Sequence, residues 1–455
     1  AVLLSAWFLA QFDFFVVNVA APSFTNELGA GPAQVELIVG GYAFSYAAGM
    51  ISGGRLGDRY GYRRVFVAGV LAFTAASLLC GLATGPGQLV AARLAQGLAG
   101  AVMVPQVLAA IVAVFPAERR SRALSWYGVA GGLGSIAGQV LGGLLLDADL
   151  LGLGWRVIFL VNVPVGLLAA TLAVRLLPEP GTRRATGQDP LGAAGIALVL
   201  ALLLLPLSLG RGEGWPAWTW VSLAASVPLG VLVAAWQRRL RIRGGAPVLD
   251  ATLFRARSYR AGAGAVIAFM AYFASFMFTL ALLLQGGFGL SALRAGLVFA
   301  PMGVLFSVAA LLAPGLRARY GAFVSVWGSI MTGTGLGLLL LSLHAGGLRI
   351  ALGWIVASLM LVGLGNGLVL PSLIGIALTH VRPEQAGIGS AVLSTAQQFA
   401  GAAGVAVIGT IFFEAAGPAQ DHLRAMEVSA LINLALVAVV TLLLGRLARA
   451  ATEST

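Results

Sequence analysis

Apolar runs long enough to cross a lipid bilayer recur from one end of the chain to the other. A membrane-spanning helix needs ~20 mainly apolar residues. Only 10% of the 455 residues are charged and the mean hydropathy is +0.95, whereas soluble domains are about a quarter charged. The sequence therefore predicts an all-α integral membrane protein with fourteen spans, near residues 1–21, 35–54, 65–83, 88–113, 123–146, 157–177, 190–208, 216–236, 260–284, 293–313, 323–343, 350–372, 386–413 and 428–447.

The arginines predict which loops share a side of the membrane. All 28 basic residues are arginine; twenty-two fall on one side of the predicted spans, five on the other, and Arg93 lies within a span. Because positive residues are enriched in cytoplasmic loops, both termini are expected in the cytoplasm, with the chain in a bacterial cytoplasmic membrane. A chain without lysine has no GxxxxGK[ST] loop, so ATP is not expected to drive it through such a loop.

The remaining composition argues against several other functions. One cysteine, Cys80, excludes an internal disulfide, and three scattered histidines do not predict a metal site. The net charge of +12 follows the loops, so nucleic acid is not an expected partner. A membrane enzyme would need converging catalytic or metal-binding side chains, and the spans offer only Asp13, Arg93 and amides. No enzymatic activity, metal or cofactor is expected.

A short motif occurs twice at the ends of predicted spans. "RLGDRYG" (55–61) and "GLRARYG" (315–321) share Leu, Arg, Tyr and Gly at an offset of 260 residues, which corresponds to eight spans. Two six-helix bundles joined by two extra helices would give this offset, and parallel six-helix repeats are a recurrent plan of secondary transporters. We therefore predict an N-terminal bundle (1–177), a linker with two extra transmembrane helices (178–259) and a C-terminal bundle (260–455).

Several ordered motifs resemble those of a known family. "GGRLGDRYGYRR" (53–64) and "LVAARLAQGLAGA" (89–101) resemble the loop and helix-4 signatures of the major facilitator superfamily. "FDFFVVNVAAP" (12–22), "WRVIFLVNVPVG" (155–166) and "STAQQFAGAAGVAVIGTIFF" (394–413) are similar to segments of its fourteen-helix drug:proton antiporters. The resemblance covers essentially the whole chain and implies that family's fold and proton-driven export of lipophilic organic compounds.

Asp13 is the first candidate for proton coupling. An ionised carboxylate near the bilayer centre costs ~2.5–3.5 kcal/mol on insertion scales, so such residues usually face a cavity and carry function. Arg93, also within a span, is the expected charge partner or switch. A static Asp13–Arg93 pair that only joins two helices is the alternative. Glu36 and Glu414 lie near span ends and are expected to contact water, with Glu414 kept as a second coupling candidate.

The loop at 53–64 is a candidate latch between the bundles on the cytoplasmic side. Its glycines permit tight turns, and its charged residues would pair with each other or with a neighbouring helix end. In the second copy Ala318 replaces Asp58, so only one strong latch is expected. The alternative interpretation is that the arginines of this loop only set the orientation of the chain in the membrane. The predicted latch residues are Gly54, Gly57, Asp58, Arg59, Gly61, Arg63 and Arg64.

Helix 5 contains a strip of small residues. Gly134, Gly138 and Gly142 recur every four residues, a spacing that lets helix backbones approach closely in lipid. The stretch resembles the antiporter motif of helix 5, with Gln139 where that motif has proline. We predict a gate here, or ordinary tight packing, and Gln139 is a candidate to reach the cavity.

Aromatic and methionine residues favour a pocket for varied hydrophobic ligands. Asn162 and Asn366 are further candidates for polar contacts there. The predicted cavity residues are Phe12, Asn18, Tyr42, Tyr46, Trp126, Met270, Tyr272, Phe273, Gln397 and Gln398.

The leading prediction is an exporter that exchanges a small lipophilic organic substrate for protons by alternating access, working as a monomer. A proton-coupled importer of a small metabolite and a non-transporting membrane scaffold are the alternatives. Neutral and cationic substrates both stay open, because few charges are predicted within the spans.

Overall fold

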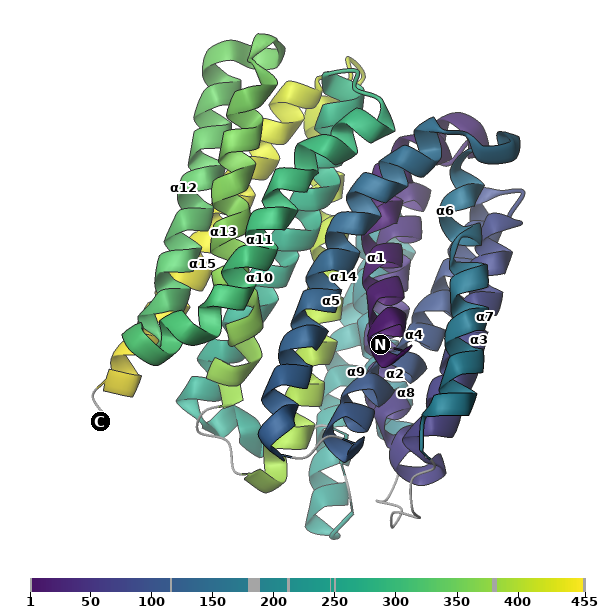
Figure 1. Ribbon diagram of the computed structural model, residues 1–455, viewed down its shortest axis with the longest axis vertical. Helices are drawn as coiled ribbons and strands as arrows, with labels where there is room; N and C mark the ends of the chain where they lie inside the picture. The colour runs from purple at the N-terminus through teal and green to yellow at the C-terminus, as the bar shows by residue number, and fades with distance from the viewer. Residues whose placement is uncertain are drawn as a thin grey trace.

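The computed structural model describes residues 2–114, 117–178, 189–210, 213–245, 247–248, 251–378 and 383–452, and within these ranges the secondary structure is helical (Figure 1). Thirteen helices are long and apolar enough to cross a membrane. The helix α2 runs for 29 residues and completes the fourteen predicted spans among the described residues. The prediction of an all-α membrane protein is confirmed.

The long helices cover the predicted spans, and several of them extend six or seven residues beyond the predicted ends. They are α1 (Val2–Leu28), α2 (Pro32–Tyr60), α3 (Tyr62–Gly81), α4 (Pro86–Val114), α5 (Ala117–Asp147), α8 (Pro190–Leu209), α9 (Ala217–Ile242), α10 (Arg257–Leu282), α11 (Ala292–Tyr320), α12 (Phe323–Gly346), α13 (Leu352–Leu378), α14 (Pro383–Ala416) and α15 (His422–Thr452).

One span is broken into short pieces. A 3₁₀ turn (Gly154–Arg156) leads into α6 (Val157–Leu160), and α7 (Asn162–Leu176) follows after Val161. Pro164 lacks the N–H that would bond to the carbonyl of Leu160, so the helix is interrupted here. The break places Asn162 at the first turn of α7, deep inside the bundle.

The helices form two bundles that repeat the same packing. In one bundle α1 packs on α5, α2 on α4, and α3 on both α4 and α7; in the other, α10 packs on α14, α11 on α13, and α12 on both α13 and α15. The bundles meet where α5 packs on α11 and where α2 packs on α14. Two six-helix bundles are therefore confirmed, while the exact domain boundaries stay a prediction.

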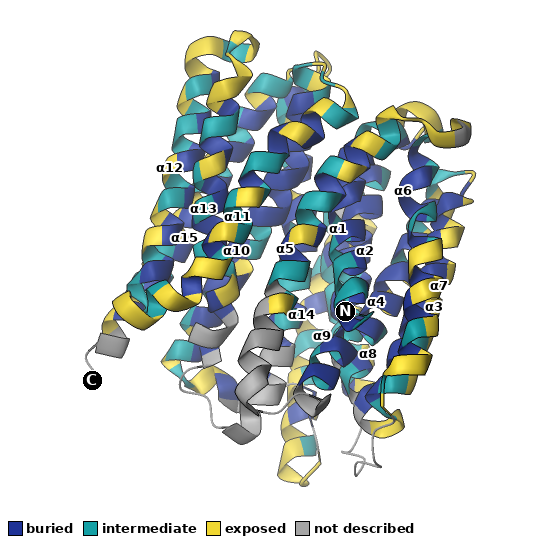
Figure 2. Ribbon diagram, viewed as in Figure 1, coloured by how far each residue is buried: buried dark blue, intermediate teal, exposed yellow. Residues whose placement is uncertain are grey.

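The outer surface of the bundles is apolar, as contact with lipid requires. Figure 2 shows buried residues where helices face one another and exposed residues along the outer sides of α12 and α7. Leu168, Val231 and Leu341 are more than half exposed although they are aliphatic. The chain is thus a multi-pass membrane protein.

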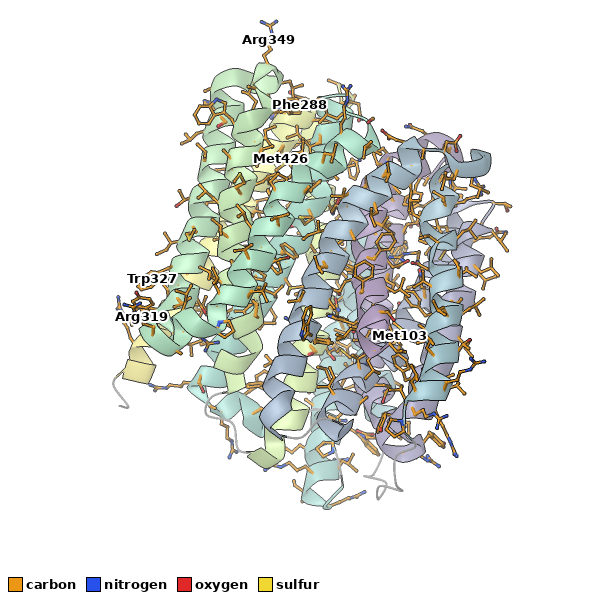
Figure 3. The ribbon with its side chains drawn as sticks, in the orientation of Figure 1. Met103, Phe288, Arg319, Trp327, Arg349 and Met426 are labelled. Atoms are coloured by element: carbon orange, nitrogen blue, oxygen red, sulfur yellow. The ribbon has the colours of Figure 1, made fainter. Side chains whose placement is uncertain are left out.

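Arginines are concentrated at one end of the molecule, which we call the basic end. It carries Arg59, Arg63, Arg64, Arg175, Arg238, Arg239, Arg241, Arg243, Arg317 and Arg319. In Figure 3, Arg319 lies beside Trp327 at the lower end of the C-terminal bundle, and Arg349 projects from the upper, opposite end. The described helices therefore end alternately at the basic end and at the opposite end, as the arginine distribution predicts.

The repeated motif closes α2 and α11 in the same way. Gly61 and Gly321 follow the last residues of these helices with φ of 87° and 68°, a region that favours glycine. The Arg59 guanidinium lies 5.0 Å from the ring centre of Tyr60, and that of Arg319 lies 5.2 Å from the ring centre of Tyr320. The repeat read from the sequence is therefore also a structural repeat.

The two extra helices form a hairpin at the junction of the bundles. The helix α8 packs on α9 and also on α2 and α14, one helix from each bundle. Asp189 caps α8: Oδ1 accepts from Gly192 N at 2.8 Å and from Trp236 Nε1 at 3.0 Å, and Oδ2 accepts from Gln237 Nε2 at 2.5 Å. This buried cap fixes α9 against α8.

Candidate functional site: a buried ion pair beside a central cavity

Asp13 lies fully buried inside the N-terminal bundle. Arg93 on α4 donates to Oδ2 and forms an ion pair with it. Oδ1 accepts from Gln96 Nε2 at 2.8 Å and from Asn162 Nδ2 at 2.9 Å. A buried charge is tolerated only when it is paired and hydrogen-bonded, and both conditions are met here. The predicted meeting of Asp13 and Arg93 is confirmed.

A second layer of hydrogen bonds orients the two amides. Ser77 Oγ accepts from Gln96 Nε2 at 3.1 Å and from Asn162 Nδ2 at 3.0 Å, and it donates to the carbonyl of Phe159 at 2.9 Å. We did not predict Gln96 or Ser77. Gln96 lies three residues after Arg93, a helical neighbour spacing that could have identified it.

Arg93 is enclosed on several sides. Its Nε donates to the carbonyl of Ile38 at 3.1 Å, and Nη1 also donates to Gln96 Oε1 at 2.7 Å. The guanidinium lies 4.6 Å from the ring centre of Tyr42. Nη2 has no hydrogen-bond partner among the described residues. The hydrogen bonds of the charged pair are therefore nearly complete among the described residues, with only the Nη2 group of Arg93 unpaired.

A cavity of about 400 Å³ lies between the two bundles. Its apolar wall consists of Trp7, Phe14, Phe15, Tyr46, Met50, Tyr127, Met270, Phe273, Met277, Phe299, Met302 and Phe306, among other residues. Its polar side chains are Gln11, Ser135, Gln139, Ser394, Gln397 and Gln398. Among the described residues that line it, none is charged. Neither Asp13 nor Arg93 lines the cavity, whereas Gln11, Phe14 and Phe15 on other faces of α1 do.

Contacts between the bundles close the cavity toward the end opposite the basic end. Ser291 Oγ donates to Asp147 Oδ2 at 2.6 Å, which joins α11 to α5. Gln285 Nε2 donates to the carbonyl of Val19 on α1 at 2.9 Å. At the second seam, Thr410 Oγ1 on α14 donates to Glu36 Oε2 on α2 at 3.4 Å. The cavity therefore occupies the middle of the molecule and its basic half.

Glu36 differs from the expectation that it contacts water. Its side chain is 2% exposed, because α2 turns it toward α14. Glu414, in contrast, is exposed near the end of α14, as expected. The burial of Glu36 could not be read from its position near a span end, because it depends on the approach of the other bundle.

Half of the predicted cavity residues line the cavity, namely Tyr46, Met270, Phe273, Gln397 and Gln398. The other five lie elsewhere. Tyr42 is buried under the Arg93 guanidinium, Tyr272 bonds to Asn366 inside the C-terminal bundle, and Trp126 is 55% exposed. Phe12 packs its backbone against α5, and Asn18 lies in a narrow gap between the bundles. Asn162 and Asn366 likewise belong to buried networks rather than to the cavity wall.

Several lining residues were missed although a helical pattern marks them. On α5, the missed residues Tyr127, Gly131 and Ser135 recur every four residues along one face; Gln139, which was expected to reach the cavity, continues the same row and does line it. On α11, Phe299, Met302 and Phe306 also lie on one face of the helix, at spacings of three and four residues. These residues are as apolar as residues that face lipid. Only the position of the second bundle shows that they line the cavity instead.

The glycine strip of α5 packs against α1 in its own bundle. A Cβ on Gly138 would lie 2.7 Å from the carbonyl oxygen of Phe12, and one on Gly134 would lie 2.7 Å from that of Phe8. A Cβ on Gly142 would lie 2.5 Å from Val16 Cγ2. The neighbouring Gly143 instead faces α11, where a Cβ would lie 2.4 Å from the carbonyl oxygen of Ala292. Close packing is thus present, and a gating role stays a prediction.

Part of the candidate latch can be placed. Glycines of α2 pack on α4: a Cβ on Gly57 would meet Gln106 Oε1 at 1.9 Å, and one on Gly54 would lie 3.8 Å from Pro105. Arg63 donates to the carbonyl of Val174 on α7, and Arg64 is exposed.

The side chain of Asp58 lies outside the described residues. The contacts of the latch residues given above are within the N-terminal bundle. A latch between the two bundles stays a prediction.

The fold and this cavity define a helical membrane protein with two bundles around a central compartment. The sequence profile of the Major Facilitator Superfamily matches residues 3–405. The chain belongs to this superfamily, and the resemblance read from its motifs is confirmed.

Its relatives include named exporters. The chain is 39% identical to the "Probable actinorhodin transporter" of Streptomyces coelicolor, over 90% of this chain and 72% of the relative. It is 34% identical to "Cephamycin export protein CmcT" of Amycolatopsis lactamdurans, over 98% and 92% of the two chains. "Puromycin resistance protein pur8" of Streptomyces alboniger is 33% identical over 90% and 80%.

Solved structures share the fold at low identity. A peptide transporter POT in complex with sulfate is 18% identical with a TM-score of 0.71, covering 98% of this chain and 94% of that one. The xylose transporter XylE from E. coli is 15% identical with a TM-score of 0.64, covering 97% and 95%. These likenesses support the fold alone.

Proposed function

We propose that this protein exports a small lipophilic organic compound across the cytoplasmic membrane in exchange for protons. The observation that carries the proposal is the position of α1. One face of this helix holds the buried Asp13–Arg93 pair, and other faces present Gln11, Phe14 and Phe15 to the cavity. The names of the relatives, which include transport, export and resistance proteins, support a substrate of the antibiotic type.

Protonation of Asp13 would change the packing of α1. A neutral carboxyl no longer balances Arg93, so the guanidinium must find other acceptors or the two helices must separate. Because Phe14 and Phe15 follow Asp13 directly, such a shift moves the cavity wall. Proton binding and substrate release are then coupled through one helix, without contact between the proton and the substrate.

Alternating access would require the opposite end to open. The contacts of Asp147 with Ser291 and of Gln285 with Val19 would break, and the bundles would close at the basic end. In this proposal the basic end faces the cytoplasm, so the conformation described here takes up substrate from that side.

A proton-release assay in inside-out vesicles tests the proposal. We expect a transported compound to collapse a preformed acid-inside pH gradient only in vesicles that contain the protein. A broad panel of lipophilic compounds, including antibiotics, is the appropriate probe, with protein-free vesicles as the control. If no compound moves protons and none accumulates, the non-transporting scaffold becomes the better description.

A further inference from the structure

Gln139 lines the cavity, and its buried amide has no hydrogen-bond partner among the residues that the structure describes. It is 1% exposed, and neither Oε1 nor Nε2 has a partner among the described residues. A buried amide usually has its hydrogen bonds satisfied, because each unpaired polar group costs about 1–3 kcal/mol. Gln139 is therefore a donor and an acceptor held ready for a group that enters the cavity.

The position of Gln139 places this amide at the closed end of the compartment. Among the residues of α5 that line the cavity, it lies farthest from the basic end. There the backbone of α5 is fixed against α11, since a Cβ on Gly296 would lie 2.5 Å from the carbonyl oxygen of Gln139. A ligand that reaches this end meets an amide on a rigid helix.

Among the residues that the structure describes, the rest of the cavity wall carries no charged side chain. The described side chains that line it are aromatic, aliphatic, amide or hydroxyl groups. Asp13 does not line the cavity, and its carboxylate is occupied by Arg93, Gln96 and Asn162 inside the bundle. A cationic ligand would lose its hydration without gaining a counter-charge.

The shape of the wall favours flat rings. Trp7 and Tyr127 stack with ring centres 4.6 Å apart and an interplanar angle of 7°. Phe15 and Phe273 approach from opposite bundles, with ring centres 5.7 Å apart. Aromatic side chains pack well on other aromatic rings, and methionines adapt to varied outlines.

Resting on the proposed export function, we infer that the substrate is an uncharged polycyclic aromatic compound with a hydrogen-bond donor next to an acceptor. Gln139 would recognise that edge: Nε2 donates to the carbonyl of the ligand, and Oε1 accepts from its N–H or O–H. A lactam fused to aromatic rings has this arrangement. Gln139 is then the specificity-determining residue of the cavity.

Three compounds with the same ring frame test this recognition. Phenanthridinone is flat and uncharged and has N–H beside C=O; N-methylphenanthridinone lacks the donor; and N-methylphenanthridinium is a cation. Equilibrium dialysis with the purified full chain in lipid nanodiscs measures binding of each. We expect phenanthridinone to bind roughly fivefold more tightly than its N-methyl derivative, since one hydrogen bond contributes about 1 kcal/mol. The cation N-methylphenanthridinium should bind no more tightly than N-methylphenanthridinone.

Two variants connect the preference to Gln139. Gln139→Leu should remove the difference between phenanthridinone and its N-methyl derivative, and Gln139→Glu should shift the preference toward the cation. Thr334→Val, an exposed hydroxyl on α12, is the control and should bind as the native chain does. The inference is overturned if the native chain prefers the cation, or if Gln139→Leu leaves the lactam preference intact.

Vesicle measurements separate this inference from the export function. If the cation collapses the acid-inside gradient and the lactam does not bind, export stands and the substrate class is wrong. If the lactam binds through Gln139 but no compound moves protons, the binding site stands and the export function is wrong.

Discussion

The two bundles share their packing but bury different polar groups. In the N-terminal bundle the described buried polar residues include the charged side chains Asp13, Glu36 and Arg93. In the C-terminal bundle the described buried polar residues are all uncharged. There Asn366 Nδ2 donates to Tyr272 Oη at 3.1 Å, and Thr332 Oγ1 donates to Asn366 Oδ1 at 3.1 Å.

This difference separates what the fold needs from what the function needs. Both bundles place a glycine of their fifth helix on a carbonyl of their first: a Cβ on Gly138 would lie 2.7 Å from the oxygen of Phe12, and one on Gly404 would lie 2.3 Å from that of Ala271. The shared glycines serve helix packing. Among the residues that the structure describes, only the N-terminal bundle contains a buried ion pair, and this pair is where we expect proton binding and release.

The largest effect is expected from removing the charge in the N-terminal bundle. Asp13→Asn should reduce substrate-dependent proton release to the level of protein-free vesicles, because an amide does not bind and release protons near neutral pH. Asn366→Leu in the C-terminal bundle should cost about 1–3 kcal/mol of stability, because it leaves the buried Tyr272 hydroxyl unpaired, but leave the protons released per substrate unchanged. Fluorescent pH dyes in vesicles measure both.

A double variant controls for folding in this experiment. Asp13→Asn alone leaves Arg93 buried without a counter-charge, whereas Asp13→Asn with Arg93→Gln removes both charges. The double variant should elute as a monodisperse protein and still fail to release protons. Full proton release by Asp13→Asn would leave the ion pair a structural contact and make Glu414 the next residue to test.

An intermediate effect is expected where the bundles are alike. Gly138→Ala and Gly404→Ala should each lower stability by about 1–3 kcal/mol, since an added methyl group meets backbone atoms. Gly337→Ala, where a Cβ would meet nothing within 4 Å, is the matched control. Thermal unfolding in detergent compares the three. A loss confined to one bundle would argue against equivalent packing.

The smallest effect is expected at the repeated helix ends. Gly61→Ala and Gly321→Ala force a Cβ into positive φ and should each cost about 1–3 kcal/mol, at the lower end of that range. Gly315→Ala, within α11 and without a close neighbour, should change stability little. The same unfolding measurement applies. Clearly unequal losses at Gly61 and Gly321 would show that the two motifs have diverged in structural role.

The sequence allowed the helices and the ion pair to be predicted, but not the cavity wall. Apolar length and arginine spacing are local signals, so every span was found, although several helices extend six or seven residues beyond the predicted ends. Asp13 and Arg93 were recognisable because charge is rare at membrane depth. Phe14 and Phe12 are alike by composition, and which of them faces the cavity depends on how the second bundle docks. Burial of Glu36 was missed for the same reason.

A cavity whose described lining residues carry no charge has an electrical consequence. If the cargo carries no charge and only the proton does, each exchange moves one positive charge inward. Membrane voltage then drives export together with acidity, at ~2.3 kcal/mol per 100 mV for each proton. A pump of this design keeps working when the outside is no more acidic than the cytoplasm, so long as the cell interior stays electrically negative.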